Sequence, residues 1–95
     1  MTLEQIRVDI DEIILAGDHG KVRLSTSISR NDFDNAVPGN LAQNKRREWI
    51  DQHADALADL MVKKYERGES NRRFHGTPPV PVEHVIVSSA DLQSL

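Results

Sequence analysis

The sequence of 95 residues contains no cysteine, has only 4% aromatic residues and has no long apolar run. The lack of cysteine excludes a disulfide-stabilised scaffold, a thiolate metal site and a cysteine nucleophile. The longest apolar stretch, residues 13–16, is far shorter than the roughly 20 residues that a membrane-spanning helix needs. We therefore expect a small soluble protein in the cytoplasm, with no membrane partner.

Motifs that bind phosphate or present a nucleophile are also absent. The chain has no G-x-x-x-x-G-K-[ST], no G-x-G-x-x-G and no G-x-S-x-G sequence. Its 12 basic and 15 acidic residues give a formal net charge of −3, which disfavours attraction of the whole chain to nucleic acid. We expect a protein that is not an enzyme and that uses neither a cofactor nor a metal.

Residues 3–17 fit two patterns. As a helix, Leu3, Ile6, Ile10 and further isoleucines would share one face, and as a strand, Ile6, Val8 and Ile10 would alternate with charged residues. The β-branched residues among them favour the strand, because such side chains pack well on a pleated surface.

Residues 21–29 show the clearest alternation in the chain. Val22, Leu24, Thr26 and Ile28 occupy every second position, which predicts a half-buried strand. The segment 17–20 is rich in residues that favour turns, so we expect a β-hairpin that joins residues 6–15 to 21–29.

A single long helix is predicted over residues 41–67. The stretch 30–39 contains Pro38 and Gly39 and is expected to be a loop, whereas residues 41–67 contain neither glycine nor proline. Asn40 is a suitable N-cap and Gly68 a suitable terminator. The apolar stripe of this helix would cover the hairpin, and its first turns, which carry polar residues on the same face, would project or fray.

The composition changes after residue 68. Residues 69–82 are first basic and then proline-rich, which is typical of an extended linker, and residues 83–88 could form a short strand at a sheet edge or in a neighbouring subunit. The sequence thus predicts an α+β fold with a small domain at residues 1–68 and an arm at residues 69–95, whose last residues are frayed.

Acidic residues and histidines give only weak indications of a chemical site. Asp9 and Asp11 would share a face of the expected strand and could bind a divalent cation or form an acid/base pair. His53 lies near several aspartates, but the spacing of two residues to Asp51 and Asp55 does not suit metal ligation on a helix. A solvated face explains the acidic residues equally well, and His53 is better explained as a partly buried histidine at the edge of the apolar stripe.

Two basic clusters next to aromatic residues are the main candidates for partner binding. The first is Lys45, Arg46 and Arg47 beside Trp49, and the second is Arg72 and Arg73 beside Phe74. Such clusters can hold phosphates and stack a base, or they can surround an aromatic anchor in a protein interface. A solvated charged face is the simpler explanation, since Lys and Arg are common near the C-terminal ends of helices. Val85 and Val87 of the terminal strand are added as residues that would pair with a partner.

The segment Ile6–Gly17 resembles the first strand of small proteins found with phage-tail-like contractile injection systems. The resemblance covers these residues alone and implies a setting related to phages or mobile elements.

These features predict a non-catalytic protein-interaction module, which forms a homodimer or joins a larger assembly as an adaptor. The small hydrophobic core gives a single chain only modest stability, which favours association. The terminal strand on a long arm favours it as well, because this strand could pair with the sheet edge of another chain. The alternative is a small regulator, which either binds nucleic acid through its Lys and Arg clusters or inhibits a nucleic-acid-binding protein through its acidic faces.

Overall fold

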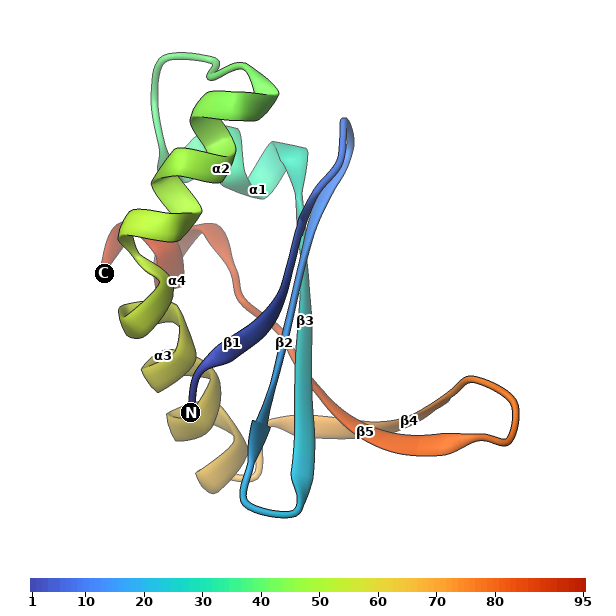
Figure 1. Ribbon diagram of the computed structural model, residues 1–95. Coiled ribbons are helices and arrows are strands. Elements are labelled where there is room, and N and C mark those ends of the chain that lie inside the picture. The colour runs from blue at the N-terminus through green and yellow to red at the C-terminus, as the bar shows by residue number, and fades with distance from the viewer.

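The computed structural model describes residues 1–95 as one five-stranded sheet with four helices on one side (Figure 1). Its strands are β1 (Leu3–Val8), β2 (Glu12–His19), β3 (Val22–Ser29), β4 (Ser70–His75) and β5 (Val80–Val85). The helices are α1 (Arg30–Ala36), α2 (Gln43–Gln52), α3 (Ala54–Glu66) and α4 (Ser89–Gln93). The predicted α+β class is confirmed. None of the helices is long and apolar enough to cross a lipid bilayer.

The strand prediction for the N-terminal residues is confirmed, but the segment forms two strands. A turn at residues 9–11 separates β1 from β2, so that β1, β2 and β3 form an antiparallel meander where a single hairpin was expected. The strand order is β1-β2-β3-β5-β4, with β5 parallel to β3 and antiparallel to β4. The meander therefore supplies one edge of the sheet, and β4 supplies the other.

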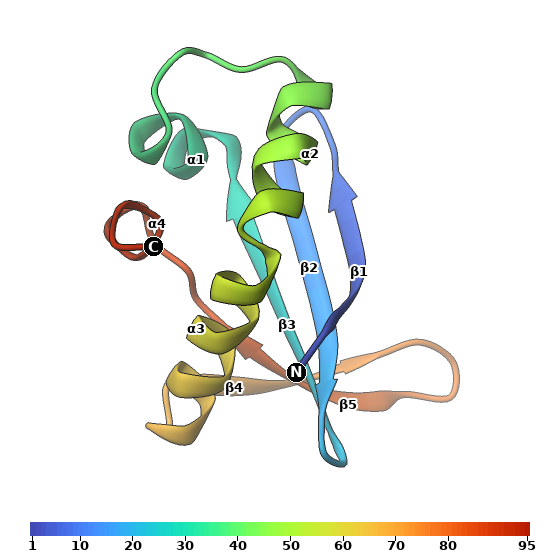
Figure 2. The same cartoon turned by 60° about the vertical axis from the view of Figure 1, so that its left-hand side comes forward.

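The apolar alternation in β2 and β3 separates the two faces of the meander. Ile13, Leu15, Leu24 and Ile28 are fully buried or nearly so against the helices, which also contribute buried apolar residues to the core. Figure 2 shows α3 lying across this face of the sheet. The helical contribution to the core comes from the following residues: Phe33, Ile50, Leu57, Met61 and Leu92.

The prediction of one long helix is wrong, because the chain bends at His53. This residue ends α2 and precedes α3 with φ −108° and ψ 12°, which lies outside the helical range. The helix also starts later than expected, with Ala42 as the N-cap and with Asn40 at a φ of 47°. The bend lets α2 lie beside β1 while α3 crosses the centre of the sheet (Figure 2).

Two short helices occupy segments that were expected to be irregular. The predicted loop 30–39 begins with α1, because the Ser29 hydroxyl accepts a hydrogen bond from the Asp32 amide. The predicted frayed end contains α4, which starts with a capping box between Ser88 and Asp91. A hydrogen bond from Ser89 Oγ to the Asp32 carbonyl joins the starts of these two helices.

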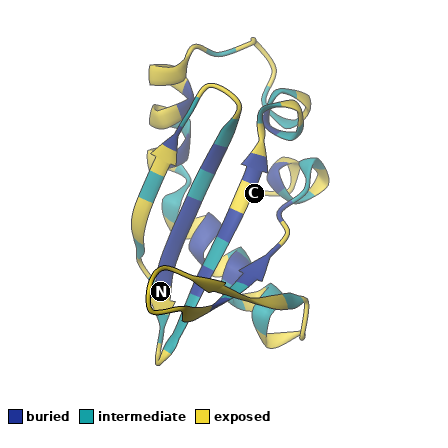
Figure 3. Cartoon of the chain, turned by 90° about the vertical axis from the view of Figure 1, so that its right-hand side faces the viewer, coloured by how far each residue is buried: buried dark blue, intermediate teal, exposed yellow.

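The expected extended linker is a β-hairpin. Residues 70–75 pair with residues 80–85, and Gly76, at φ +86°, begins the turn that joins them. This β4–β5 hairpin projects from the side of the sheet opposite the helices (Figure 1). Its outer part is exposed, whereas β2 and β3 are mostly buried or half-buried (Figure 3). The division of the chain at residue 68 stays a prediction, although β5 and β3 belong to one sheet.

We predict that Thr26→Val stabilises the protein. The Thr26 side chain is 1% exposed, and its Oγ1 has no hydrogen-bond partner. Valine has nearly the same shape and removes the cost of the buried, unpaired hydroxyl, so the free energy of unfolding should rise by about 1 kcal/mol. Urea denaturation followed by circular dichroism measures this change. Thr26→Ala is the control, because it also removes a methyl group and should lower the stability. A lower stability of Thr26→Val would contradict the prediction.

Candidate functional site

The first basic cluster lies on α2, and its central residue is buried. Arg46 is 3% exposed, and its guanidinium donates hydrogen bonds to the carbonyls of Leu41 (3.0 Å) and Asp9 (2.9 Å). It makes no ion pair. The donors of Arg46 hold the loop before α2 to the turn after β1, and the expected contact of Arg46 with a partner stays a prediction.

Two neighbours of Arg46 cover the outer edge of β1. Gln43 donates a hydrogen bond of 2.6 Å to the Val8 carbonyl, and Arg47 donates one of 3.1 Å to the Ile6 carbonyl. Ile6 and Val8 are alternate residues of the strand, so their carbonyls point the same way, out from the edge. The polar first turns of α2 thus neither fray nor project, because their side chains hydrogen-bond to the backbone carbonyls of β1. An additional strand would need these same carbonyls in order to pair with β1.

The remaining cations of this cluster are paired at the surface. Lys45 Nζ lies 3.2 Å from a Glu48 carboxylate oxygen, and Arg47 Nε lies 3.0 Å from an Asp51 carboxylate oxygen. Both pairs join successive turns of one helix, as is common on solvated helix surfaces. The positive charges of Lys45 and Arg47 are therefore already paired within the helix and do not require a bound ligand.

Trp49 is half-buried between two other rings. It meets Phe33 of α1 edge-on at 5.3 Å between ring centroids and stacks on His53 at 3.9 Å. The Nδ1 of His53 donates a hydrogen bond of 2.7 Å to the Trp49 carbonyl in the last turn of α2. Trp49 therefore packs α1 against the end of α2, and its expected role as a partner anchor stays a prediction.

The second basic cluster lies on the projecting hairpin, and its members differ in their surroundings. Arg72 pairs with Glu83 of β5 at 3.1 Å. Arg73 makes no ion pair and no side-chain hydrogen bond, and Phe74 is 65% exposed. Of the two clusters, only this one presents an aromatic side chain and an unpaired arginine to solvent.

The two valines of the terminal strand are buried. Val85 is 0% and Val87 1% exposed, and both belong to the core. Val85 pairs with Ser70 at the start of β4, so the terminal strand is used within the chain. Their expected role in pairing with a partner stays a prediction, which this burial does not support.

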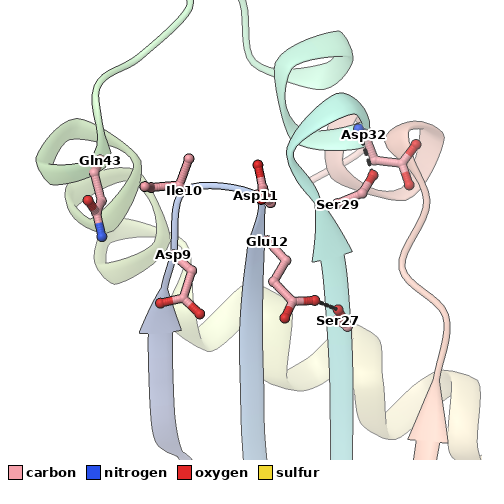
Figure 4. A pocket seen from close by; sticks show the side chains of 8 residues that line it. All are labelled: Asp9, Ile10, Asp11, Glu12, Ser27, Ser29, Asp32 and Gln43. Carbon is pink, nitrogen blue, oxygen red and sulfur yellow. Dashed lines mark hydrogen bonds between the residues drawn. The ribbon is translucent and has the colours of Figure 1, made fainter.

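An open acidic cavity of about 660 Å³ lies at the turn between β1 and β2 (Figure 4). Asp9, Asp11, Glu12 and Asp32 line it, but their side chains diverge in Figure 4. Asp9 is bound by Arg7, and Glu12 accepts a hydrogen bond from Ser27. No group of three His, Asp or Glu side chains in the chain could hold a metal ion. His53 does not line this cavity and stacks on Trp49.

A second cavity, which the sequence did not indicate, lies where the hairpin meets the open face of the meander. This cleft has a volume of about 500 Å³ and is lined by residues of all five strands. Arg73 and His75 of β4 and His84 of β5 form its hairpin wall, and Ser25 and Ser27 of β3 lie among its other lining residues. The alternation of Arg73 and His75 was a sequence signal for a shared face, but it lay in the segment taken for a linker.

His84 is the buried titratable group of this cleft. Its side chain shares a hydrogen bond of 3.2 Å with the Ser25 hydroxyl, and the residue is 9% exposed. Burial, together with the positive charges of Arg73 and His75, lowers the pKa of His84 below its ordinary value of 6.5. The neutral imidazole is therefore favoured at neutral pH, in a place where positive charge accumulates.

No protein-family model matches the sequence, and no significant match exists among curated proteins or solved structures.

We predict that Arg46→Met destabilises the protein by about 3 kcal/mol. The substitution keeps an unbranched side chain but leaves the carbonyls of Leu41 and Asp9 without their buried donor. Lys45→Met is the matched control, because it removes the same charge from an exposed position and should cost less than about 0.5 kcal/mol. Urea unfolding of both variants checks the prediction. Equal losses would show that Arg46 contributes only its charge.

Proposed function

We propose that the chain is a non-catalytic protein-interaction module that forms a homodimer through β4. The observation that carries this proposal is the difference between the two sheet edges. Side chains of α2 occupy the edge of β1, whereas no side chain hydrogen-bonds to the backbone of β4. A free edge strand can pair with an additional strand, because its outer amides and carbonyls lack partners.

The side chains of β4 favour one register of the dimer. A two-fold axis at Phe74 places the two Phe74 side chains opposite each other and Arg73 opposite His75 of the second copy. An axis at Arg73 would instead place two arginines opposite each other, which is unfavourable. Aromatic pairs across strands stabilise a sheet, so the exposed Phe74 supplies the apolar centre of the interface.

The proposed dimer suits an adaptor or assembly component. It would join the two sheets into one continuous sheet and leave the helices of both copies out of the interface. The setting related to phages or mobile elements, which the resemblance of residues 6–17 implies, stays a prediction.

We predict that Phe74→Ala weakens dimerisation about thirtyfold, as expected for loss of an aromatic anchor at the centre of an interface. Light scattering and sedimentation velocity on the full chain over a range of concentrations measure the dimer. Val80→Ala is the control, because Val80 is a similarly exposed apolar residue of the same hairpin that lies outside β4 (55% against 65%). A monomer at every concentration, or equal effects of the two substitutions, would overturn the proposal.

A regulator that binds nucleic acid is the second candidate, and the shape of the hairpin favours it. A projecting two-stranded ribbon that carries Arg73 and ends at Pro78 and Pro79 could enter a groove of duplex DNA. Fluorescence anisotropy with a labelled duplex tests this function. If the chain binds nucleic acid in this way, the binding should weaken steeply with added salt. The substitution Arg73→Gln should also reduce the binding more than Lys45→Gln does. The absence of binding at low salt would exclude this candidate.

A further inference from the structure

We propose that the cleft between the β4–β5 hairpin and the open face of the sheet is a binding site for a phosphate or sulfate group of a small ligand. The guanidinium of Arg73 and the imidazoles of His75 and His84 line one wall, and the Ser25 hydroxyl adds a hydrogen-bonding group, whereas the Ser27 hydroxyl already donates to Glu12. The proposed dimer uses the outer backbone edge of β4, whereas this site uses side chains on the face of β4 that lines the cleft, so the two proposals have separate tests.

The arginines that line the cleft differ in whether a carboxylate neutralises them. Arg7 is bound by Asp9, and Arg23 by Glu4 and Asp18, so both are neutralised by neighbouring carboxylates. Arg73 has no such partner. An oxyanion would give this guanidinium the charge-assisted hydrogen bonds that it lacks in the free protein.

The carboxylate in the cleft does not fill this role. Glu12 is the only acidic residue among the lining side chains, and one of its oxygens accepts a hydrogen bond of 2.9 Å from Ser27. It lies on β2, whereas Arg73 lies on the hairpin. Glu12 limits how much negative charge the cleft can take, which favours one compact anion over an extended acidic chain.

The buried imidazole is a further argument for the site. His84 is held by Ser25, and its neutral form is favoured because of burial and of the nearby charges of Arg73 and His75. A bound anion would offset these charges and raise the pKa of His84 toward its ordinary value. Binding is therefore coupled to proton uptake, and a lower pH should strengthen it.

The test is a titration of the full chain with sulfate, followed by amide and imidazole chemical shifts. Sulfate suits this purpose because its charge does not change between about pH 5.5 and pH 7.5. We expect saturable shifts at Ser25, Arg73 and His84 and tighter binding at the lower pH. The other groups that face the cleft and could modulate this dependence are Arg7, Glu12, Arg23 and His75. The absence of saturable shifts at these positions would overturn the proposal.

Two matched variants separate a site from general electrostatic attraction. Arg73→Gln should weaken sulfate binding about fivefold or more, because it removes the unpaired guanidinium of the wall. Arg72→Gln removes the same charge from the adjacent residue, which pairs with Glu83 and does not line the cleft, and it should change binding less than about twofold. Equal losses in the two variants would refute a specific site.

The histidine has its own test. His84→Asn should reduce the difference in sulfate affinity between the two pH values, whereas His19→Asn, which changes a histidine outside the cleft, should not. If His84→Asn folds poorly, the pKa of His84 in the unaltered chain serves instead, since it should rise when sulfate is added. A pKa that stays constant at saturating sulfate would refute the coupling.

The source of the anion is addressed by comparing inorganic phosphate with a nucleoside monophosphate in the same titration. Tighter binding of the monophosphate would show that the rest of the cavity holds the attached group. Equal affinities would assign the cleft to the bare anion.

Discussion

The buried guanidinium of Arg46 fixes the arrangement of α2 against the sheet. A charged side chain that is almost completely removed from water is stable only where polar groups replace its hydration. Two carbonyls do so here, one in the loop before α2 and one in the turn after β1. Because neither belongs to the body of α2, the helix cannot move from β1 without exposing or unpairing the guanidinium.

The difference between the two sheet edges follows from this contact. With α2 held in place, Gln43 and Arg47 reach the outward carbonyls of β1 and close that edge. No helix side chain hydrogen-bonds to the backbone of β4, and the β4–β5 hairpin leaves the sheet on the side opposite the helices (Figure 1). The same departure creates the cleft, because the hairpin forms a wall beside the open face of the meander. The free edge and the cleft thus have one structural origin.

The parts of the fold that depend on local spacing could be predicted from the sequence. The alternation of Val22, Leu24, Thr26 and Ile28 identified β3, because a strand must place alternate side chains on one face. The caps at Ser29 and Ser88 were not recognised in the sequence, because Ser29 precedes a run of turn-forming residues and Ser88 lies near the chain end. The bend at His53 had no such signal, since no glycine or proline marks it. It depends on α2 and α3 packing against different parts of the sheet.

The candidate site shows the same division between local and tertiary information. Sequence reasoning grouped the basic residues by their proximity to an aromatic side chain, but the role of each cation depends on its partner in space. Arg46 binds carbonyls inside the protein, Arg72 binds a carboxylate across the hairpin, and Arg73 binds nothing. Arg72 and Arg73 are adjacent in the chain, yet successive residues of a strand point to opposite faces. Only the pairing of β4 with β5 decides which arginine meets Glu83 and which one faces the cleft. A basic cluster in a sequence is therefore a set of separate cations, and the one left without a counter-charge is the one available to a ligand.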